Sequence, residues 1–167
     1  MAKGACKHAA LVVTTQILLF LRNSTMADLQ FKLTDEVWED MVTLEGAPVT
    51  AIVVWDRSLV DEIMAQPITD KTRVFVDIDL YLANQTKLEL YGASVTANEG
   101  SEPIMGLAEI GDTLARHTRN GAFIGEIAAA EDDLLVLVLN NDGERSLLIG
   151  VSAWLEDVWE TLPEESI

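Results

Sequence analysis

Between residues 73 and 91 the chain alternates between apolar and polar side chains. The apolar positions before the first turn are Val74, Val76, Ile78, Leu80 and Leu82. A period of two predicts a β-strand with one fully apolar face. A turn around Asn84 and Gln85 leads to a return strand whose apolar residues are Leu88 and Leu90. We therefore predict a β-hairpin with both apolar sets facing the core.

The other side of this hairpin is polar. Keeping both apolar sets on one face requires the numbers of two paired residues to add up to an even number, because a one-residue shift turns a strand over. The opposite face then carries Asp77, Asp79, Tyr81, Lys87, Glu89 and Tyr91. We expect this face to be open and treat it as the candidate interaction face.

Two chemical roles fit these residues. Neighbouring carboxylates whose pKa values differ can act as an acid and a base. Clustered carboxylate oxygens also suit hard cations such as calcium or magnesium. The simpler explanation is that one face of an antiparallel sheet is solvated, which produces the same alternation.

Before the hairpin, the pattern predicts a strand, a helix and a second strand. Residues 29–33 alternate as in a half-buried strand. Thr34 can cap a helix over residues 35–44, with acidic residues in its first turn. A strand over residues 41–44 is the alternative. The β-branched run at residues 49–55 predicts a buried strand.

Two further segments have helical features. Ser58 and Asp61 resemble a capping box, so we predict a helix that ends at Pro67. Residues 98–106 have the composition of a loop. Residues 107–119 have helical spacing, but Asn120-Gly121 can also form a tight hairpin turn, which would make residues 113–119 a strand.

The last part of the chain predicts three strands and a helix. Residues 123–129 form the first strand. Residues 134–139 are apolar throughout, as in a strand that is covered on both sides or lines a closed core. A turn at residues 141–143 leads to a strand at residues 147–151. Ser152 then caps a predicted helix whose apolar stripe contains Trp154, Leu155, Val158, Trp159 and Leu162.

Together these elements predict an α+β fold with a mostly antiparallel sheet or a partly closed barrel. It would contain about six strands and two to four short packed helices. We predict one acidic globular domain over residues 26–167, preceded by a leader over residues 1–25.

The leader contains no acidic residue and holds Lys3, Lys7 and Arg22 around an apolar run. It can be a secretory signal, an artefact of translation from a start upstream of Met26, a disordered segment or a native helix. As a membrane anchor it is too short, since thirteen residues span only about 20 Å of a ~30 Å hydrocarbon core. We expect a cytoplasmic protein, or a secreted one if the leader is a signal.

The charge of residues 26–167 limits the classes of partner that the domain can bind. Residues 26–167 hold eight basic and 28 acidic residues, hence 8 − 28 = −20. Such a charge repels nucleic acid and anionic lipid, so we expect neither nucleic-acid nor membrane binding. A basic protein surface is the partner that fits, unless acidity is general in the source proteome. Because Cys6 is the only cysteine, the body has no cysteine nucleophile and no zinc-thiolate site.

The one basic cluster of the body is a candidate anion site, formed by Arg116, His117 and Arg119. A helix end with solvated cations is the simpler explanation. The chain lacks the phosphate-binding glycine loop, the nucleophile elbow and the calcium-loop spacing. We identify no metal site and expect no cofactor.

Our leading hypothesis is a small acidic, non-enzymatic interaction module that binds a basic protein partner, as an inhibitor or chaperone does. The alternative is a small-ligand binder or acid/base enzyme with a pocket in a half-closed barrel. There Asp77, Asp79 or Glu89 would act as acid or base, and Arg116 or His117 would hold the substrate. A third possibility is a homo-oligomer that pairs through the helix of Trp154 and Trp159.

Overall fold

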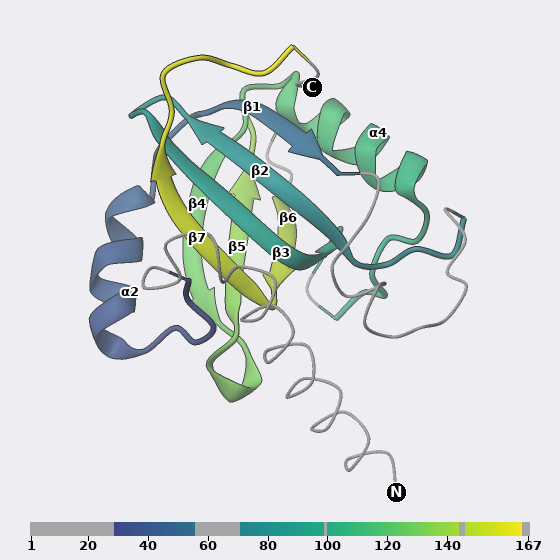
Figure 1. Cartoon of the computed structure of the whole chain (residues 1–167). Coiled ribbons are helices and arrows are strands. Elements are labelled where there is room, and N and C mark those ends of the chain that lie inside the picture. Colours follow the sequence, from purple (N-terminus) through teal and green to yellow (C-terminus); the bar gives the residue numbers. More distant parts are fainter. Residues whose placement is uncertain (1–28, 56–70, 99, 144–145, 165–167) are drawn as a thin grey trace, which may run out of the picture.

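The computed structural model describes residues 29–55, 71–98, 100–143 and 146–164. These residues form an α+β fold with an antiparallel sheet (Figure 1). Its helical segments are α2 (Asp35–Met41), η3 (Val42–Leu44), α4 (Leu107–Thr118) and η4 (Glu131–Asp133). Its strands are β1 (Val49–Val54), β2 (Val76–Leu82), β3 (Thr86–Thr96), β4 (Phe123–Ala129), β5 (Leu135–Asn140), β6 (Ser146–Val151) and β7 (Ala153–Val158).

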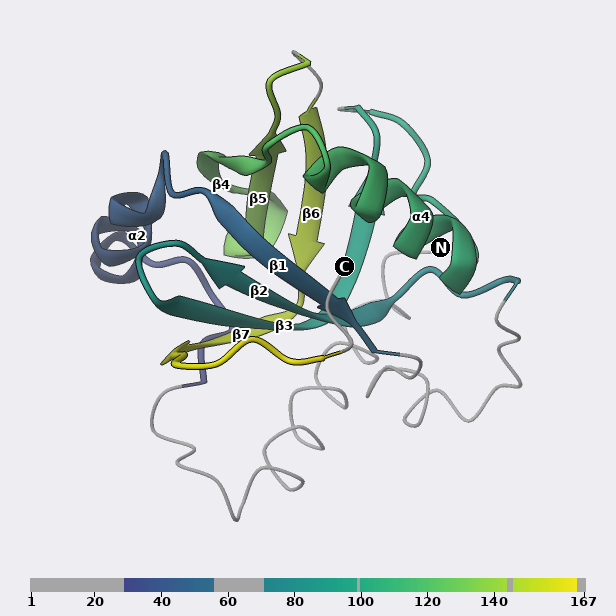
Figure 2. The same ribbon diagram turned by 90° about the horizontal axis from the view of Figure 1, so that it is seen from above.

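The sheet is a strongly bent, open surface that does not close into a barrel. The strand order is β1-β2-β3-β6-β5-β4, and β7 pairs with β3 outside this path. The first half of β3 lies between β2 and β7, while its second half pairs with β6. The long strand β3 therefore joins two smaller sheets that face each other across the core (Figure 2).

The bend in β3 has a local cause at Gly92. The pairing of β2 with β3 shifts by one residue between Val76 and Ile78. Gly92 has a φ of 56°, which favours glycine, and its N–H donates to Asp77 Oδ1 over 2.9 Å. A bulge of this kind turns the strand and increases its twist. Asp77 thus helps to hold the bend.

The core lies between the two halves of the sheet. Alternate residues of β2, β3, β5 and β6 are fully buried there, together with Trp154 of β7. Helix α4 contributes Ile110 and Leu114, both 0% exposed, and packs beside β1 (Figures 1 and 2). Helix α2 contributes Met41. The helices fill the sides that the bent sheet leaves open.

The first predicted helix is confirmed. Thr34 is its N-cap, with the Val37 N–H donating to Thr34 Oγ1 over 3.4 Å, and η3 continues it to Leu44. The alternative strand over residues 41–44 is wrong. The strand predicted at residues 29–33 shrinks to a single bridge between Gln30 and Trp154. Leu29 and Leu33 are nevertheless buried, as the alternation required.

The ambiguous segment after residue 106 is helical. Helix α4 places Ile110, Leu114 and His117 on its buried side and Arg116 on its exposed side. The alternative strand over residues 113–119 is wrong, because the turn at Asn120-Gly121 connects α4 to β4 instead. The helix predicted after Ser58 lies outside the described residues.

Strand β5 corrects one prediction. Residues 134–139 are predicted to be covered on both faces or to line a closed core, but only Leu135, Leu137 and Leu139 are buried. Val136 and Val138 on the other face are half-buried, and Leu134 is 41% exposed. The strand lies inside the sheet between β4 and β6, yet no second layer covers its outer face completely.

The helix predicted after Ser152 is wrong, because residues 153–158 form strand β7. The Ser152 N–H donates to the Tyr91 carbonyl, and Ser152 Oγ donates to the Gly92 carbonyl over 3.0 Å. These hydrogen bonds direct the chain along the side of β3 that does not pair with β2. Ladder hydrogen bonds and burial of Trp154 therefore outweigh the helical pattern. Trp154 and Trp159 therefore do not share a helical face, and formation of a homo-oligomer stays a prediction.

Among the described helices, none is long and apolar enough to cross a membrane.

Candidate functional site

The hairpin has the register that the alternation predicts. Ile78 pairs with Leu90, Asp79 with Glu89, Leu80 with Leu88, and Tyr81 with Lys87. Each pair adds up to an even number, so the six candidate residues lie on the face opposite the core. The bulge separates Asp77 from the others, and Asp77 helps to hold the bend in β3. The other five residues of the candidate interaction face lie close together beyond the bulge.

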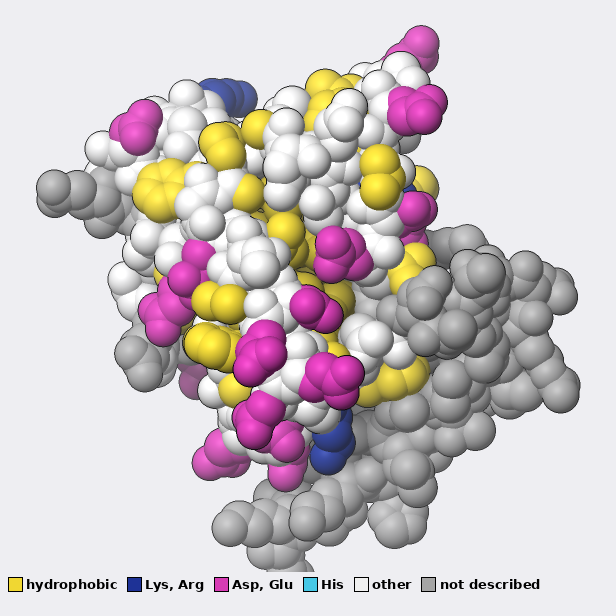
Figure 3. Space-filling model, turned by 90° about the vertical axis from the view of Figure 1, so that its left-hand side faces the viewer, with side chains coloured by type: hydrophobic (Ala, Val, Ile, Leu, Met, Phe, Trp, Pro, Cys, Tyr) yellow, Lys and Arg dark blue, Asp and Glu magenta, His cyan; other side chains and the backbone are white. Residues whose placement is uncertain are grey.

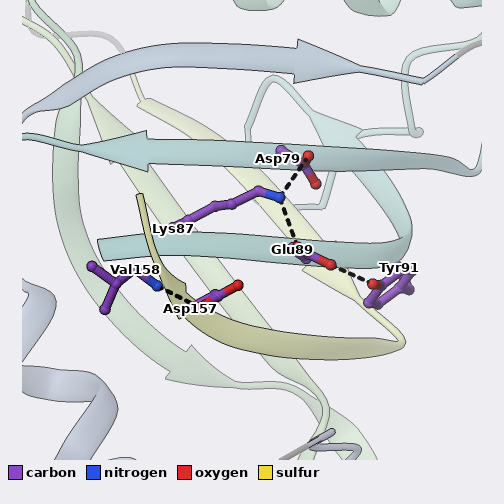
Figure 4. A network of polar contacts seen from close by, with 6 residues as sticks. All are labelled: Asp79, Lys87, Glu89, Tyr91, Asp157 and Val158. Carbon is purple, nitrogen blue, oxygen red and sulfur yellow. Dashed lines mark hydrogen bonds and ion pairs between the residues drawn. The ribbon is translucent and has the colours of Figure 1, made fainter. Parts of the chain in front are cut away.

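Lys87 is the centre of this face (Figure 4). Its Nζ lies 2.6 Å from Glu89 Oε1 and 3.3 Å from Asp79 Oδ2. Glu89 Oε2 accepts a hydrogen bond of 2.6 Å from the Tyr91 hydroxyl. Two carboxylates, one ammonium group and one phenol therefore form a continuous network across β2 and β3.

Burial and charge alter the proton affinities of this network. Burial raises the pKa of Asp79 above its ordinary 3.8, the charge of Lys87 opposes this rise, and Glu89 adds to it. Burial disfavours the charged form of Lys87, but the hydrogen bond to Glu89 and the two carboxylate charges raise its pKa overall. Burial and the bond to Glu89 raise the pKa of Tyr91. At neutral pH Lys87 is charged and both tyrosines are neutral.

Aromatic groups cover one end of the network. Lys87 Nζ lies 5.7 Å from the ring centre of Tyr81, and the Tyr81 and Trp159 rings meet edge to face at 5.9 Å. Trp159 Nε1 donates to the Leu82 carbonyl over 2.9 Å. Asp79 is 6% exposed and Tyr81 is 7% exposed. The expectation of an open, solvated face is therefore wrong at these two residues.

The network leaves little room for the cation role considered from sequence. The Lys87 ammonium already occupies the position between Asp79 and Glu89 that a metal ion would take. Among the described residues, no group of three or more His, Cys, Asp and Glu side chains is placed to hold a metal ion. The charges on this face are largely satisfied within the chain.

A second acidic region lies between helix α2 and strand β7. A groove of about 400 Å³ is lined by Gln30, Val37, Asp40, Met41, Thr86, Trp154, Glu156, Asp157 and Val158. We call it the acidic groove. Partial burial raises the pKa of Glu156, and the negative charge of Asp40 raises it further. Its carboxylates are those of Asp40 and Glu156, since Asp157 lies opposite Lys87 on the other face of β7. The described lining contains no Lys or Arg that would neutralise these two charges.

The surface around the acidic groove is also acidic. Figure 3 shows this side of the molecule, with Asp and Glu side chains gathered around exposed apolar ones and few basic groups. The exposed acidic residues of α2 are Asp35, Glu36, Glu39 and Asp40. Sequence reasoning missed this groove because it predicted β7 as a helix, which separated Glu156 from Asp40.

The candidate anion residues line one groove beside α4. Arg116, His117 and Arg119 all contribute to its wall, and its volume is about 1020 Å³. Arg116 reaches Glu109 over 3.4 Å between largely exposed side chains. The role of these residues in anion binding stays a prediction.

His117 faces the interior and takes part in a structural contact. Its Nε2 lies 2.9 Å from the Leu139 carbonyl, and its Nδ1 lies 3.1 Å from Asn141 Nδ2. A neutral ring that carries its proton on Nε2 satisfies both contacts, since Nε2 then donates and Nδ1 accepts. Burial lowers the pKa of His117 below 6.5, against the opposing effect of its backbone partners. His117 is therefore neutral and occupied at both nitrogens.

Comparisons of the chain with models of known protein families, with characterised proteins and with solved structures find no match. The proposed function therefore rests on the geometry of the described residues.

Proposed function

We propose that the chain is a non-enzymatic interaction module that binds a basic protein surface through the acidic groove. The observation that carries the proposal is the pair of carboxylates of Asp40 and Glu156 between α2 and β7, with no basic side chain in the described lining. A cation placed between like charges relieves their repulsion, so a Lys or Arg side chain is the complementary group.

The contrast with the hairpin face supports this choice of surface. There Lys87 already pairs with Asp79 and Glu89, so a basic partner would have to displace an internal cation. In the acidic groove the carboxylates have no such competitor among the lining residues. Val158, which lines the groove and is 71% exposed, adds apolar area beside the charges. The groove is therefore the better docking surface.

Binding at such a site is electrostatically steered and sensitive to salt. The formal charge of the chain is −17, which raises the association rate of a basic partner at low ionic strength. At about 1 M salt the Debye length falls to about 3 Å, and most of this attraction is screened.

The test compares two variants with the same change in net charge. Asp40→Asn with Glu156→Gln neutralises the groove, whereas Glu102→Gln with Asp112→Asn removes two exposed charges elsewhere. The probe is a Lys-rich peptide titrated into each protein by calorimetry. We expect the groove variant to bind at least tenfold more weakly and the control to stay within about twofold. Equal losses in both variants would show that only the overall charge matters.

A second candidate function has one observation in its favour. Arg116 and Arg119 line the large groove beside α4, so a small ligand with a carboxylate or phosphate group could bind there. Two facts weigh against it: His117 donates its Nε2 proton to a backbone carbonyl, and the carbonyl end of a helix opposes an anion. Titration with inorganic phosphate, with Arg116→Gln/Arg119→Gln as the control, tests it.

A further inference from the structure

We propose that the outer edge of β7 takes up an extended basic segment of the partner as an additional antiparallel strand. This inference rests on the proposed function and specifies how the partner binds. Main-chain hydrogen bonds to β7 would provide the docking, and basic side chains in the acidic groove would provide the selectivity.

The hydrogen bonds of β7 determine which of its backbone groups can bind a further strand. β3 pairs with one side of β7. On the other side, the Trp154 N–H donates to the Gln30 carbonyl and the Gln30 N–H donates to the Trp154 carbonyl, each over 2.9 Å. Successive residues of a strand direct their backbone groups alternately to the two sides. The N–H and C=O of Glu156 therefore point away from β3, as those of Trp154 do.

These groups have no partner within the described part of the chain. Gln30 makes only an isolated bridge, and no backbone hydrogen bond from Glu156 is formed on this side. The Val158 N–H is satisfied by its neighbour Asp157 Oδ1 over 2.7 Å. Among the described residues, the edge of β7 without a partner is therefore short and centred on Glu156, which suits a peptide segment of a few residues.

The opposite end of the sheet shows how an edge is closed in this fold. On β4, the Ile127 N–H donates to Glu45 Oε1 over 3.0 Å, and Trp38 Nε1 donates to the Ile127 carbonyl over 3.4 Å. Ile124 is paired with Gly46 and Ala47 by backbone hydrogen bonds. Side chains and loop backbone thus cover that edge, as is usual in soluble proteins. The edge at Glu156 has no such cover among the described residues.

Side-chain directions select a basic segment. The residue paired with Glu156 places its side chain on the same face of the sheet as Glu156. That face turns toward α2 and the acidic groove, because Glu156 and Asp40 both line it. A Lys or Arg at this position would lie between the two carboxylates. Basic residues at every second position would keep this contact along the segment.

The test uses the full chain and three peptides that differ only in methyl groups. The first is an end-blocked (Lys-Thr)₄ peptide. The second carries N-methyl groups on its Lys amides, which face β7 in the proposed register, and the third carries them on its Thr amides, which face away. We expect the second to bind about tenfold more weakly than the first, and the third to bind within about twofold of it.

Two variants of the chain test the same bonds from the other side. Glu156→Pro removes the outward N–H without breaking the ladder to β3, since a proline is tolerated where the N–H faces outward. Glu156→Gln removes the charge and keeps the N–H. We expect the proline variant to bind the first peptide about fivefold more weakly than the glutamine variant. An unchanged circular dichroism spectrum confirms that both variants fold.

Hydrogen exchange separates the remaining outcomes. The Glu156 amide should exchange rapidly in the chain alone and become protected when the (Lys-Thr)₄ peptide is added. Protection in the chain alone would mean that the edge is already occupied, which overturns the inference. Equal binding of all three peptides would leave the proposed function intact and reject strand addition. No binding of any peptide at ~50 mM salt would reject both.

Discussion

At the scale of single residues, one lysine organises the hairpin face. Lys87 contacts Asp79 and Glu89, and all three side chains are at most 21% exposed. Removing one partner of a partly buried network leaves uncompensated charge, which costs more than the network contributes when it is complete. The network therefore stabilises the hairpin chiefly because it leaves neither Asp79 nor Glu89 without a cation.

We predict that Lys87→Met destabilises the fold by about 2–3 kcal/mol at neutral pH, somewhat less than for a fully buried pair. The pKa of Asp79, already raised, would rise further. A carboxyl that binds its proton more tightly when folded stabilises the fold as the pH falls, so part of the loss should be recovered toward pH 4. Urea denaturation at both pH values measures this. The Asp79→Asn/Lys87→Met double variant is the control and should be less destabilised than Lys87→Met alone.

His117 supplies a second residue-scale prediction. Its pKa is lowered in the folded chain, so its contribution to stability is complete above about pH 6.5 and is lost as the pH falls through the lowered pKa. His117→Gln can keep a donor toward the Leu139 carbonyl and cannot titrate. We expect the variant to lose the decline in melting temperature below pH 6.5 that the parent shows. The same decline in both proteins would contradict this assignment.

At the scale of elements, β7 is the strand that connects the core to both candidate faces. Trp154 is 1% exposed and belongs to the core, whereas Trp159 packs against Tyr81 beyond the end of the strand. The two tryptophans were predicted to share one helical face. In the strand and its extension they serve different parts of the molecule.

Substitution of each tryptophan therefore has a different expected effect. Trp154→Ala should cost about 3–5 kcal/mol, because it leaves a large cavity in the core. Trp159→Phe should cost about 1 kcal/mol, because it loses the hydrogen bond to the Leu82 carbonyl and keeps most of the contact with Tyr81. Chemical denaturation of both variants distinguishes the strand from the helix, for which similar losses would be expected.

At the scale of the whole molecule, the hairpin face and the acidic groove differ in how far their negative charge is neutralised. The hairpin face carries its own cation, whereas the described lining of the acidic groove contains none. If the groove binds a basic partner as proposed, its binding conflicts with stability, since like charges repel in the free protein.

This conflict predicts opposite effects of one variant. Asp40→Asn/Glu156→Gln should leave the free protein equally stable or stabilise it by about 0.5 kcal/mol or less, because the groove is solvent-screened. The raised pKa of Glu156 means that any gain appears above its ordinary pKa and vanishes in acid. The same variant should lose peptide affinity. A loss of stability instead would indicate that the carboxylates have a structural role.

Sequence patterns predicted the structure correctly where it depends on interactions between residues that are close in sequence. The alternation of apolar residues determined the hairpin and its register, because a one-residue slip would bury the polar set. Capping and spacing predicted α2, although they left a strand over residues 41–44 possible. For α4 the spacing left a strand possible, and packing of Ile110 and Leu114 into the core decided it.

The sequence by itself thus determined the hairpin, the grouping of its polar residues, the first helix and the acidic character of the chain. Only the tertiary structure decided that Lys87 neutralises the hairpin face, that β7 is a strand, and that Asp40 and Glu156 share a groove. The physical reason is that these features depend on partners distant in sequence. The free side of β3 made residues 153–158 a strand, and that pairing brought Glu156 to α2.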